Sequence, residues 1–193
     1  MAIARPRSEG IARIGIAVAA VAVAAQVAAH LVDYWAFDLR SALLDSASEH
    51  SVFVRLGIFA ILACAVATLA LARRASSRLA AVLGLATAWL FVDGLLGIHE
   101  RIPHWTLVYI PVLAAVLAGF WRLAGSSRVV RAALLSLVLS AAIHRLGPHV
   151  LSLLGWGPTA WEYQVKIALK EATEIGGWIL LASGVAARYA AYR

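Results

Sequence analysis

Apolar stretches long enough to cross a lipid bilayer alternate with short polar segments along the chain. The apolar stretches lie near residues 11–32, 52–72, 78–98, 104–122, 129–147 and 161–187. An α-helix rises about 1.5 Å per residue, so about 20 apolar residues span the hydrocarbon core. Gly, Pro and Ser mark the segments 73–78, 99–103, 122–128 and 147–160 as breaks in the helical pattern. The pattern predicts an all-α fold, a bundle of six transmembrane helices that forms a single domain over residues 1–193.

Composition supports a polytopic membrane protein in contact with the lipid bilayer. The 193 residues are 63% hydrophobic and 14% charged, with a mean hydropathy of +0.85, which lies outside the range of soluble domains. The net charge of +7 does not indicate nucleic-acid binding, because the arginines lie in short clusters between apolar stretches. Residues 1–30 have the basic start and apolar centre of a signal peptide, and we interpret them as an uncleaved first helix. The lone Cys64 is interpreted as a small core residue.

Arginine placement predicts the orientation of the bundle. Basic residues are retained on the cytoplasmic side of a membrane. Most of the basic residues lie at the two ends of the chain and in the second and fourth connections: Arg5, Arg7, Arg13, Arg73, Arg74, Arg78, Arg122, Arg128, Arg131, Arg188 and Arg193. Both termini are therefore predicted to be cytoplasmic, in a protein of the plasma (inner) membrane of a bacterium.

The remaining ionisable residues gather toward the opposite face. In the predicted topology every acid except Glu9 falls in the outer half of the bundle or in the outer loops. The histidines do the same: His30, His50, His99, His104, His144 and His149. We expect a polar site that opens to the external face.

The third helix supplies the first candidates. Asp93 and Glu100 are seven residues apart, which places them on one helical face with Gly97 between them. A carboxylate at the depth of Asp93 is costly unless it faces the bundle interior and is paired, liganded or protonated. Asp93 is therefore either a functional group or a neutral acid in a helix–helix hydrogen bond. His99 and Glu100 are either functional or ordinary interfacial polar residues.

The sixth helix carries a charged stripe. Lys170 and Glu174 are four residues apart, Glu171 and Glu174 are three apart, and Lys166 extends the stripe by a turn. Each charge facing lipid costs roughly 2.5–3.5 kcal/mol, so the stripe must face the interior. The available counter-groups are Asp93, Glu100, His144 and the pair His30 and Asp33.

A histidine of the fifth helix and the glycines of the third and sixth helices complete the set of candidates. His144 is either a ligand or a satisfied structural residue. The glycines of "GLLG" and "IGGW" favour a close contact between the helices predicted at 78–98 and 161–187.

"FVDGLLGIHERI" and "LKEATEIGGWILL" together resemble a family of uncharacterised bacterial multi-pass membrane proteins. That family has a pattern close to F-L-x-L-D-E-x-x-x-I-H-E on one helix and E-E-x-x-E-x-x-G on the last, and "LLDSASEHSVFVRLG" resembles its stretch before the second helix. By this resemblance Asp93, His99 and Glu100 occupy the polar positions of the first motif, and Glu171 and Glu174 those of the second. Gly94 and Lys170 depart from it, since each replaces an acid. The resemblance implies no activity.

Three functions stay open at this point. The first is a metal-dependent enzyme that acts on a lipid or envelope substrate, with a divalent ion such as zinc or iron. Its ligands would be Asp93, His99, Glu100, His144, Glu171 and Glu174, with catalytic roles for Glu171, Glu174 and Asp93. "HERIPH" lacks the H-E-x-x-H spacing of zinc proteases, so this hypothesis rests on convergence of the helices alone.

The second function is a transporter or channel coupled to protons or cations. The third is a non-catalytic bundle whose interior ion pairs fix helix packing, as a homo-oligomer or as a subunit of a larger membrane complex.

Overall fold

The computed structural model describes residues 5–46, 48 and 50–192, and for residues 5, 6, 100 and 106 the backbone alone. Every regular element within this part of the chain is helical, which confirms the all-α prediction. The elements are α1 (Arg5–Phe37), α2 (Val52–Ala75), α3 (Arg78–Leu96), the short 3₁₀ helix η1 (His99–Arg101), α4 (Trp105–Ala124), α5 (Arg128–Leu153) and α6 (Trp161–Ala191).

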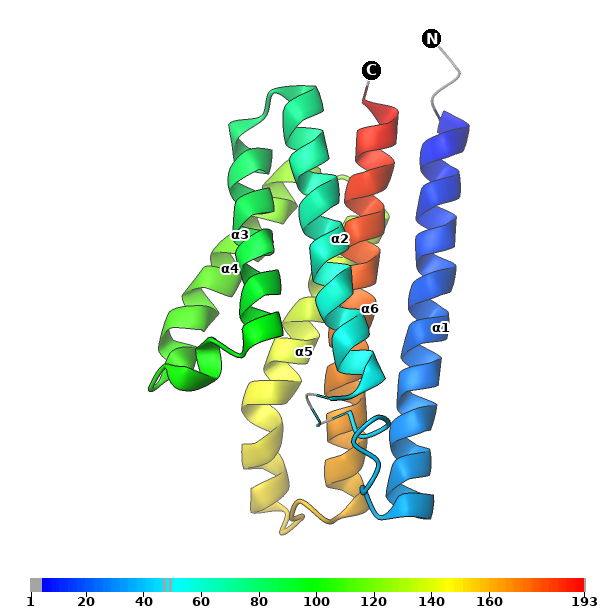
Figure 1. Cartoon of the computed structure of the whole chain (residues 1–193), viewed down its shortest axis with the longest axis vertical. Helices are drawn as coiled ribbons and strands as arrows, with labels where there is room; N and C mark the ends of the chain where they lie inside the picture. Colours follow the sequence, from blue (N-terminus) through cyan, green and yellow to red (C-terminus); the bar gives the residue numbers. More distant parts are fainter. Residues whose placement is uncertain (1–4, 47, 49, 193) are drawn as a thin grey trace.

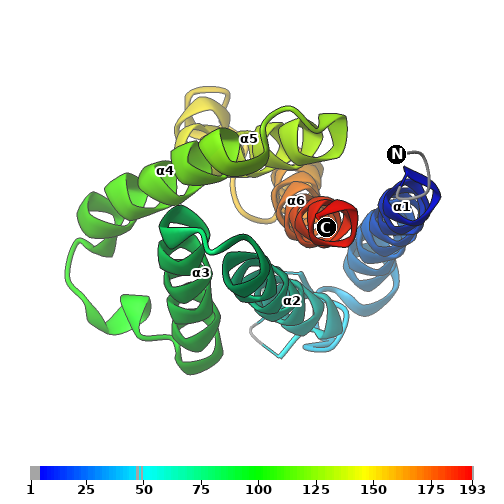
Figure 2. The ribbon, with the colours of Figure 1, turned by 90° about the horizontal axis from the view of Figure 1, so that it is seen from above.

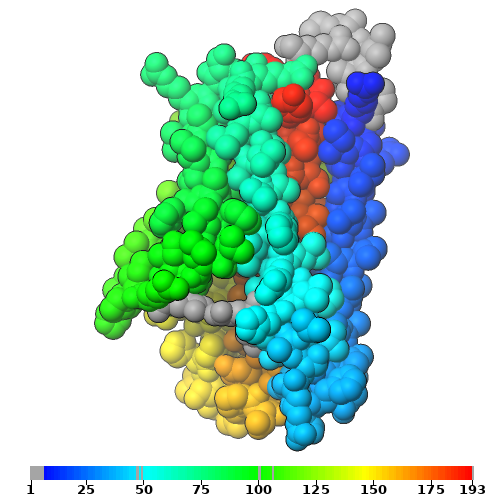
Figure 3. Space-filling view, in the orientation of Figure 1, coloured from blue at the N-terminus to red at the C-terminus, as the bar shows by residue number. Residues whose placement is uncertain are grey.

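The last helix is the centre of the bundle. α6 packs along α1, α2 and α5, while α3 packs on α2 and α4 lies at the edge against α3 and α5 (Figures 1 and 2). On the face drawn in Figure 3, α6 is visible in the upper half only as a narrow strip between α2 and α1. The most apolar part of α6, including Ile175, Trp178, Leu181 and Val185, is buried in the main core.

Five of the helices are long and apolar enough to cross a membrane: Arg7–Phe37, Val52–Ala75, Arg78–Leu96, Leu107–Ala124 and Arg128–Leu153. These helices mark the chain as a membrane-embedded protein in contact with lipid. α6 is not among them, because its first half carries Glu162, Lys166, Lys170, Glu171 and Glu174. The helices around it shelter this polar half, since a helix that other helices cover does not need an apolar surface.

Serine caps explain where three helices begin. The side chain of Ser51 accepts from Phe53 N at the start of α2, Ser77 accepts from Ala80 N at the start of α3, and Ser127 accepts from Val130 N at the start of α5. Each cap satisfies one of the free N–H groups of a first helical turn. These serines lie in the polar segments that the sequence marks as breaks.

Several helix ends differ from the sequence-based expectation, and α1 extends over Arg5–Phe37 in place of 11–32. α5 continues through Pro148 to Leu153 instead of ending near residue 147. Membrane helices tolerate proline because neighbouring groups and local adjustments satisfy the freed carbonyl. α3 ends at Leu96, and Gly97 follows in the left-handed conformation with φ 59°. The prediction that Asp93 and Glu100 share one helical face is therefore wrong, because the helix stops between them.

The glycines of α3 and α6 lie against other helices than the sequence predicted. A Cβ added to Gly177 would lie 2.7 Å from Leu137 Cγ on α5, and one added to Gly176 would lie 2.9 Å from Val23 Cγ2 on α1. On α3, Gly94 faces Ile58 of α2. The small residues thus permit contacts of α6 with α5 and α1 and of α3 with α2, in place of the expected contact between α3 and α6.

The helices alternate in direction, so the connections separate into two sets. The start of α1, the end of α6 and the turns α2–α3 and α4–α5 lie toward one end of the bundle (Figure 1). The loop α1–α2 and the turn α5–α6 lie at the other end. We refer to these as the terminal end and the loop end.

Candidate functional site

Asp93 organises the turn that follows α3. Its side chain is buried, with 4% exposure. Oδ1 accepts from the backbone N–H of His99 at 2.8 Å and from the Tyr109 hydroxyl on α4 at 2.7 Å, and Oδ2 lies 2.9 Å from His99 Nδ1. The carboxylate therefore has three donors from two elements, which compensates for its removal from water.

The hydrogen bond from Asp93 defines the state of the His99 ring. A carboxylate only accepts, so Nδ1 of His99 carries the proton. The ring lies edge-on to Trp105, with centroids 5.0 Å apart, and 5.7 Å from the Tyr109 ring. Trp105 in turn lies 6.3 Å from His144 of α5. An imidazole oriented by a carboxylate is common beside metal ions and in general-base pairs.

Lys170 forms ion pairs with two acids of α6, Glu171 and Glu174. Its Nζ lies 2.8 Å from Glu171 Oε1 and 2.8 Å from Glu174 Oε2, so one ammonium joins both carboxylates. The three side chains are 21%, 17% and 38% exposed, respectively. We call Lys170, Glu171 and Glu174 the charged triad. Pairing with the ammonium of Lys170 offsets part of the cost of removing the two carboxylates from water.

Side chains of α5 line the triad. Ser140 donates to the Lys170 carbonyl at 3.0 Å, and Ser136 donates to the Thr173 carbonyl at 2.8 Å. His144 of α5 is exposed, and Lys170, Lys166 and Glu174 lie close enough to act on it electrostatically. Gly147 makes room for the Lys166 stem, because a Cβ there would lie 3.1 Å from Lys166 Cε. Lys166 Nζ itself lies 4.9 Å from the centroid of the Tyr163 ring.

The five predicted metal ligands whose side chains are described do not form one group. Asp93 and His99 bond to each other in the turn after α3, and Glu171 and Glu174 bond to Lys170 on α6, whereas the ring of His144 on α5 lies 6.3 Å from that of Trp105. The side chain of Glu100 lies outside the described residues. Among the described residues, no group of three or more His, Cys, Asp or Glu side chains is arranged to hold a metal ion. The carboxylates of Asp93, Glu171 and Glu174 already have protein donors.

A third polar cluster ties the α1–α2 loop to the bundle. Gln26, His30 and Asp33 lie on one face of α1 and are fully buried. Gln26 donates to Ser46 Oγ at 2.6 Å, and the Ser46 amide donates to His30 Nδ1 at 3.2 Å. The Ser41 amide donates to Asp33 Oδ1 at 3.0 Å. We call Gln26, His30 and Asp33 the loop latch, because they hold residues 41–46 against α1.

Hydrogen bonding also defines the His30 tautomer. Nδ1 accepts the Ser46 amide, so Nε2 carries the proton and donates to Gln164 Oε1 of α6 at 3.1 Å. Gln164 then donates through Nε2 to the Pro158 carbonyl. Gln26 Oε1 and Asp33 Oδ2 are buried and have no hydrogen-bond partner among the described residues.

Several of the hydrogen-bond partners in these clusters were not predicted from the sequence. Gln26 and Gln164 are amides within or beside apolar stretches, and the spacing of Gln26, His30 and Asp33 at four and seven residues was the signal for a shared face. Tyr109 carried no such signal, because only the turn between α3 and α4 brings it to Asp93. His30 and Asp33 were expected to serve as counter-groups for the α6 stripe, but their described bonds are with the loop and Gln164.

An apolar core separates the polar clusters from the terminal end. The side chains around the second half of α6 include Phe120, Val130, Leu137 and Leu71, all buried. Polar residues here bond within their own helices, as Thr68 does to the Cys64 carbonyl and Thr87 to the Leu83 carbonyl. The described polar network therefore belongs to the loop half of the bundle.

Comparison with known proteins gives one match. A family model described as "Domain of unknown function (DUF8692)" matches residues 13–188. No curated protein and no solved structure matches the chain. The expected membership of an uncharacterised family agrees with this finding, whereas the two motifs and a bacterial origin remain predictions. Since the match extends from α1 to α6, the chain belongs to the DUF8692 family.

Proposed function

We propose that this protein is a six-span membrane protein whose buried charges serve to hold the bundle together, as a non-catalytic component of a membrane assembly. α6 counts as the sixth span because its 31 residues would extend about 46 Å as an α-helix. The arginines at the terminal end favour a cytoplasmic location for both termini in the inner membrane. The assembly is either a homo-oligomer or a complex with other membrane proteins.

One observation carries the structural role. Lys170 Nζ lies 2.8 Å from a carboxylate oxygen of Glu171 and of Glu174, so two of the acids predicted to bind a metal share a cation of their own helix. By the resemblance, an acid stands in the family at the position of Lys170. Lys170 places a positive charge between Glu171 and Glu174, where a metal ion would otherwise do so. Because Lys170 is part of the chain, this charge does not dissociate from the site.

Two variants test this role through the free energy of unfolding in mixed micelles. Lys170→Met leaves both acids without their cation and should destabilise the protein by up to about 3 kcal/mol, less than for a fully buried pair because Glu174 reaches solvent. The triple variant Lys170→Met, Glu171→Leu, Glu174→Leu should restore the stability to within about 1 kcal/mol. A stabilising effect of Lys170→Met would oppose the structural role, because charges kept for a ligand usually reduce stability.

A metal-dependent enzyme is the second candidate, and the Asp93–His99 pair favours it. A carboxylate bonded to Nδ1 orients an imidazole as in many metal sites. A zinc or iron ion would then have to displace Lys170 from Glu171 and Glu174, with His144 as a further ligand and a lipid or envelope molecule as substrate. Elemental analysis separates the two candidates: stoichiometric metal that disappears in Glu171→Gln would support the enzyme and refute the structural proposal.

Assembly is tested directly. The proposal expects the protein to copurify in mild detergent with a fixed set of membrane partners, or to have a mass above that of one 20.5 kDa chain. A strictly monomeric protein that copurifies with nothing would contradict it. Cation or proton flux into liposomes would indicate the transport alternative instead, against which the apolar core around the second half of α6 argues.

A further inference from the structure

The terminal end of the bundle carries positive charge without matching acids. Among the described residues it holds Arg7, Arg13, Arg73, Arg74, Arg78, Arg122, Arg128, Arg131 and Arg188. The acid on this part of the chain is Glu9, whose Oε2 lies 4.0 Å from Arg13. Most of this charge therefore has to be balanced by anions from outside the chain.

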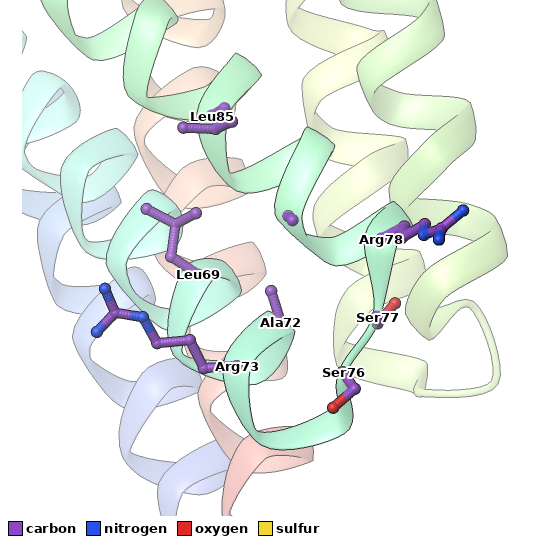
Figure 4. A pocket seen from close by; sticks show the side chains of 8 residues that line it. Leu69, Ala72, Arg73, Ser76, Ser77, Arg78 and Leu85 are labelled. Atoms are coloured by element: carbon purple, nitrogen blue, oxygen red, sulfur yellow. The ribbon is translucent and has the colours of Figure 1, made fainter.

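A groove at the α2–α3 turn combines this charge with an apolar wall. The cavity has a volume of about 480 Å³. Its lining is Leu69, Ala72, Arg73, Ser76, Ser77, Arg78, Ala81 and Leu85. Figure 4 shows Leu69 and Ala72 on α2 and Leu85 on α3, with Arg73 and Arg78 on opposite sides of the groove and their guanidinium groups directed away from each other.

The arginines of this turn differ in their partners. Arg74 lies with its guanidinium carbon 5.0 Å from the centroid of the Tyr189 ring, so it is held against the end of α6. Arg73 and Arg78 are exposed, and the described residues offer neither of them an acidic partner. Both side chains are thus available to an anion in the groove.

The wall of the groove continues onto the surface that faces lipid. Leu85 is 64% exposed and lies on α3, one of the apolar helices long enough to cross a membrane. An anion that binds here would therefore have acyl chains alongside it. A phospholipid presents a phosphate directly above its acyl chains, which matches two arginines above a leucine-lined wall.

We propose that this groove binds an anionic phospholipid, with Arg73 and Arg78 at the headgroup phosphate and Leu69 and Leu85 against the upper part of an acyl chain. The proposal depends on the chain spanning a membrane, but not on the role of the charged triad. It is independent of which side of the membrane the terminal end faces.

Competition with a fluorescent phosphatidylglycerol in zwitterionic micelles tests the site on the full-length protein. An arginine near a headgroup contributes roughly 1 kcal/mol, so the double variant Arg73→Gln, Arg78→Gln should weaken phosphatidylglycerol binding about 25-fold. The matched control Arg122→Gln, Arg131→Gln removes the same charge from the same end and should change binding less than about twofold. Equal losses in both variants would show general surface attraction and overturn the proposal, as would equally tight binding of phosphatidylcholine.

Two further measurements identify the ligand. Glycerol 3-phosphate should not compete at concentrations where phosphatidylglycerol does, and competition by it would show a phosphate site instead of a lipid site. Leu85→Ala should weaken lipid binding several-fold, because it removes a leucine side chain from the apolar wall and leaves both arginines in place. An unchanged lipid affinity in Leu85→Ala would refute the acyl-chain contact. Melting temperatures in phosphatidylcholine micelles verify that each variant is folded.

Discussion

The role of an ionisable residue in this bundle is determined by its nearest donor or acceptor. Asp93 was predicted as a metal ligand or as a neutral acid in a helix contact, and the structure gives it three donors from His99 and Tyr109. Glu171 and Glu174 were predicted as ligands too, and each lies beside Lys170. The sequence supplies the charges, but Tyr109 reaches Asp93 Oδ1 at 2.7 Å only because α4 packs beside the turn that follows α3.

Tyr109→Phe tests the bonding of Asp93. The variant removes the hydroxyl that donates to Asp93 Oδ1 at 2.7 Å and keeps the ring. Hydrogen bonds to charged groups contribute about 1.5–3 kcal/mol, so the free energy of unfolding in mixed micelles should fall by that amount. Tyr189→Phe is the control, because it keeps the aromatic face on which Arg74 lies. Equal stability of Tyr109→Phe and the wild type would mean that Asp93 does not depend on this donor.

At the scale of the element, small residues determine which helices approach closely. Gly177 of α6 faces Leu137 and the Ala133 carbonyl of α5, and Gly84 of α3 faces Leu69 of α2. The glycines of "GLLG" and "IGGW", Gly177 among them, were recognised in the sequence as sites of close contact. Their partners were not, because a glycine shows that a helix can approach but does not show which neighbour does.

Gly177→Ala tests this packing. The added Cβ would lie 2.7 Å from Leu137 Cγ, so α5 and α6 have to separate, and unfolding should become easier by about 1–3 kcal/mol. Gly10→Ala in α1 is the matched control, since nothing lies within 4 Å of its added Cβ. This control should be neutral or should stabilise α1 by up to about 1 kcal/mol. A Gly177→Ala protein as stable as the wild type would show that the contact can relax.

For the whole molecule, hydropathy predicted the class of fold and most of the architecture. The all-α fold is confirmed, and the membrane character is supported by five apolar helices. The loop latch and the hydrogen-bonded Asp93 turn were not predicted, since both depend on backbone groups that no sequence pattern reveals. The convergence of acids and histidines into one centre is not found among the described residues, because α2 and not α6 lies against α3.

Thiol labelling in spheroplasts tests the orientation of the bundle. In a Cys64→Ala background, a cysteine at Thr159 in the α5–α6 turn should react with a membrane-impermeant reagent added outside. A cysteine at Ser126 in the α4–α5 turn should react only after the membrane is permeabilised, because the arginine-rich terminal end is expected to be cytoplasmic. The reverse pattern would mean that the bundle is inverted, with the charged triad on the cytoplasmic half.

The loop latch has a consequence for how the α1–α2 loop tolerates change. His30 and Asp33 accept the backbone amides of Ser46 and Ser41, a group that every residue except proline possesses. The exposed residues of this loop can therefore be substituted, or an epitope can be inserted among them, while the loop keeps its position along α1. The exceptions are Ser41→Pro and Ser46→Pro. Each removes the amide that bonds to Asp33 or His30, and so weakens the attachment of the loop although α1 itself is unchanged.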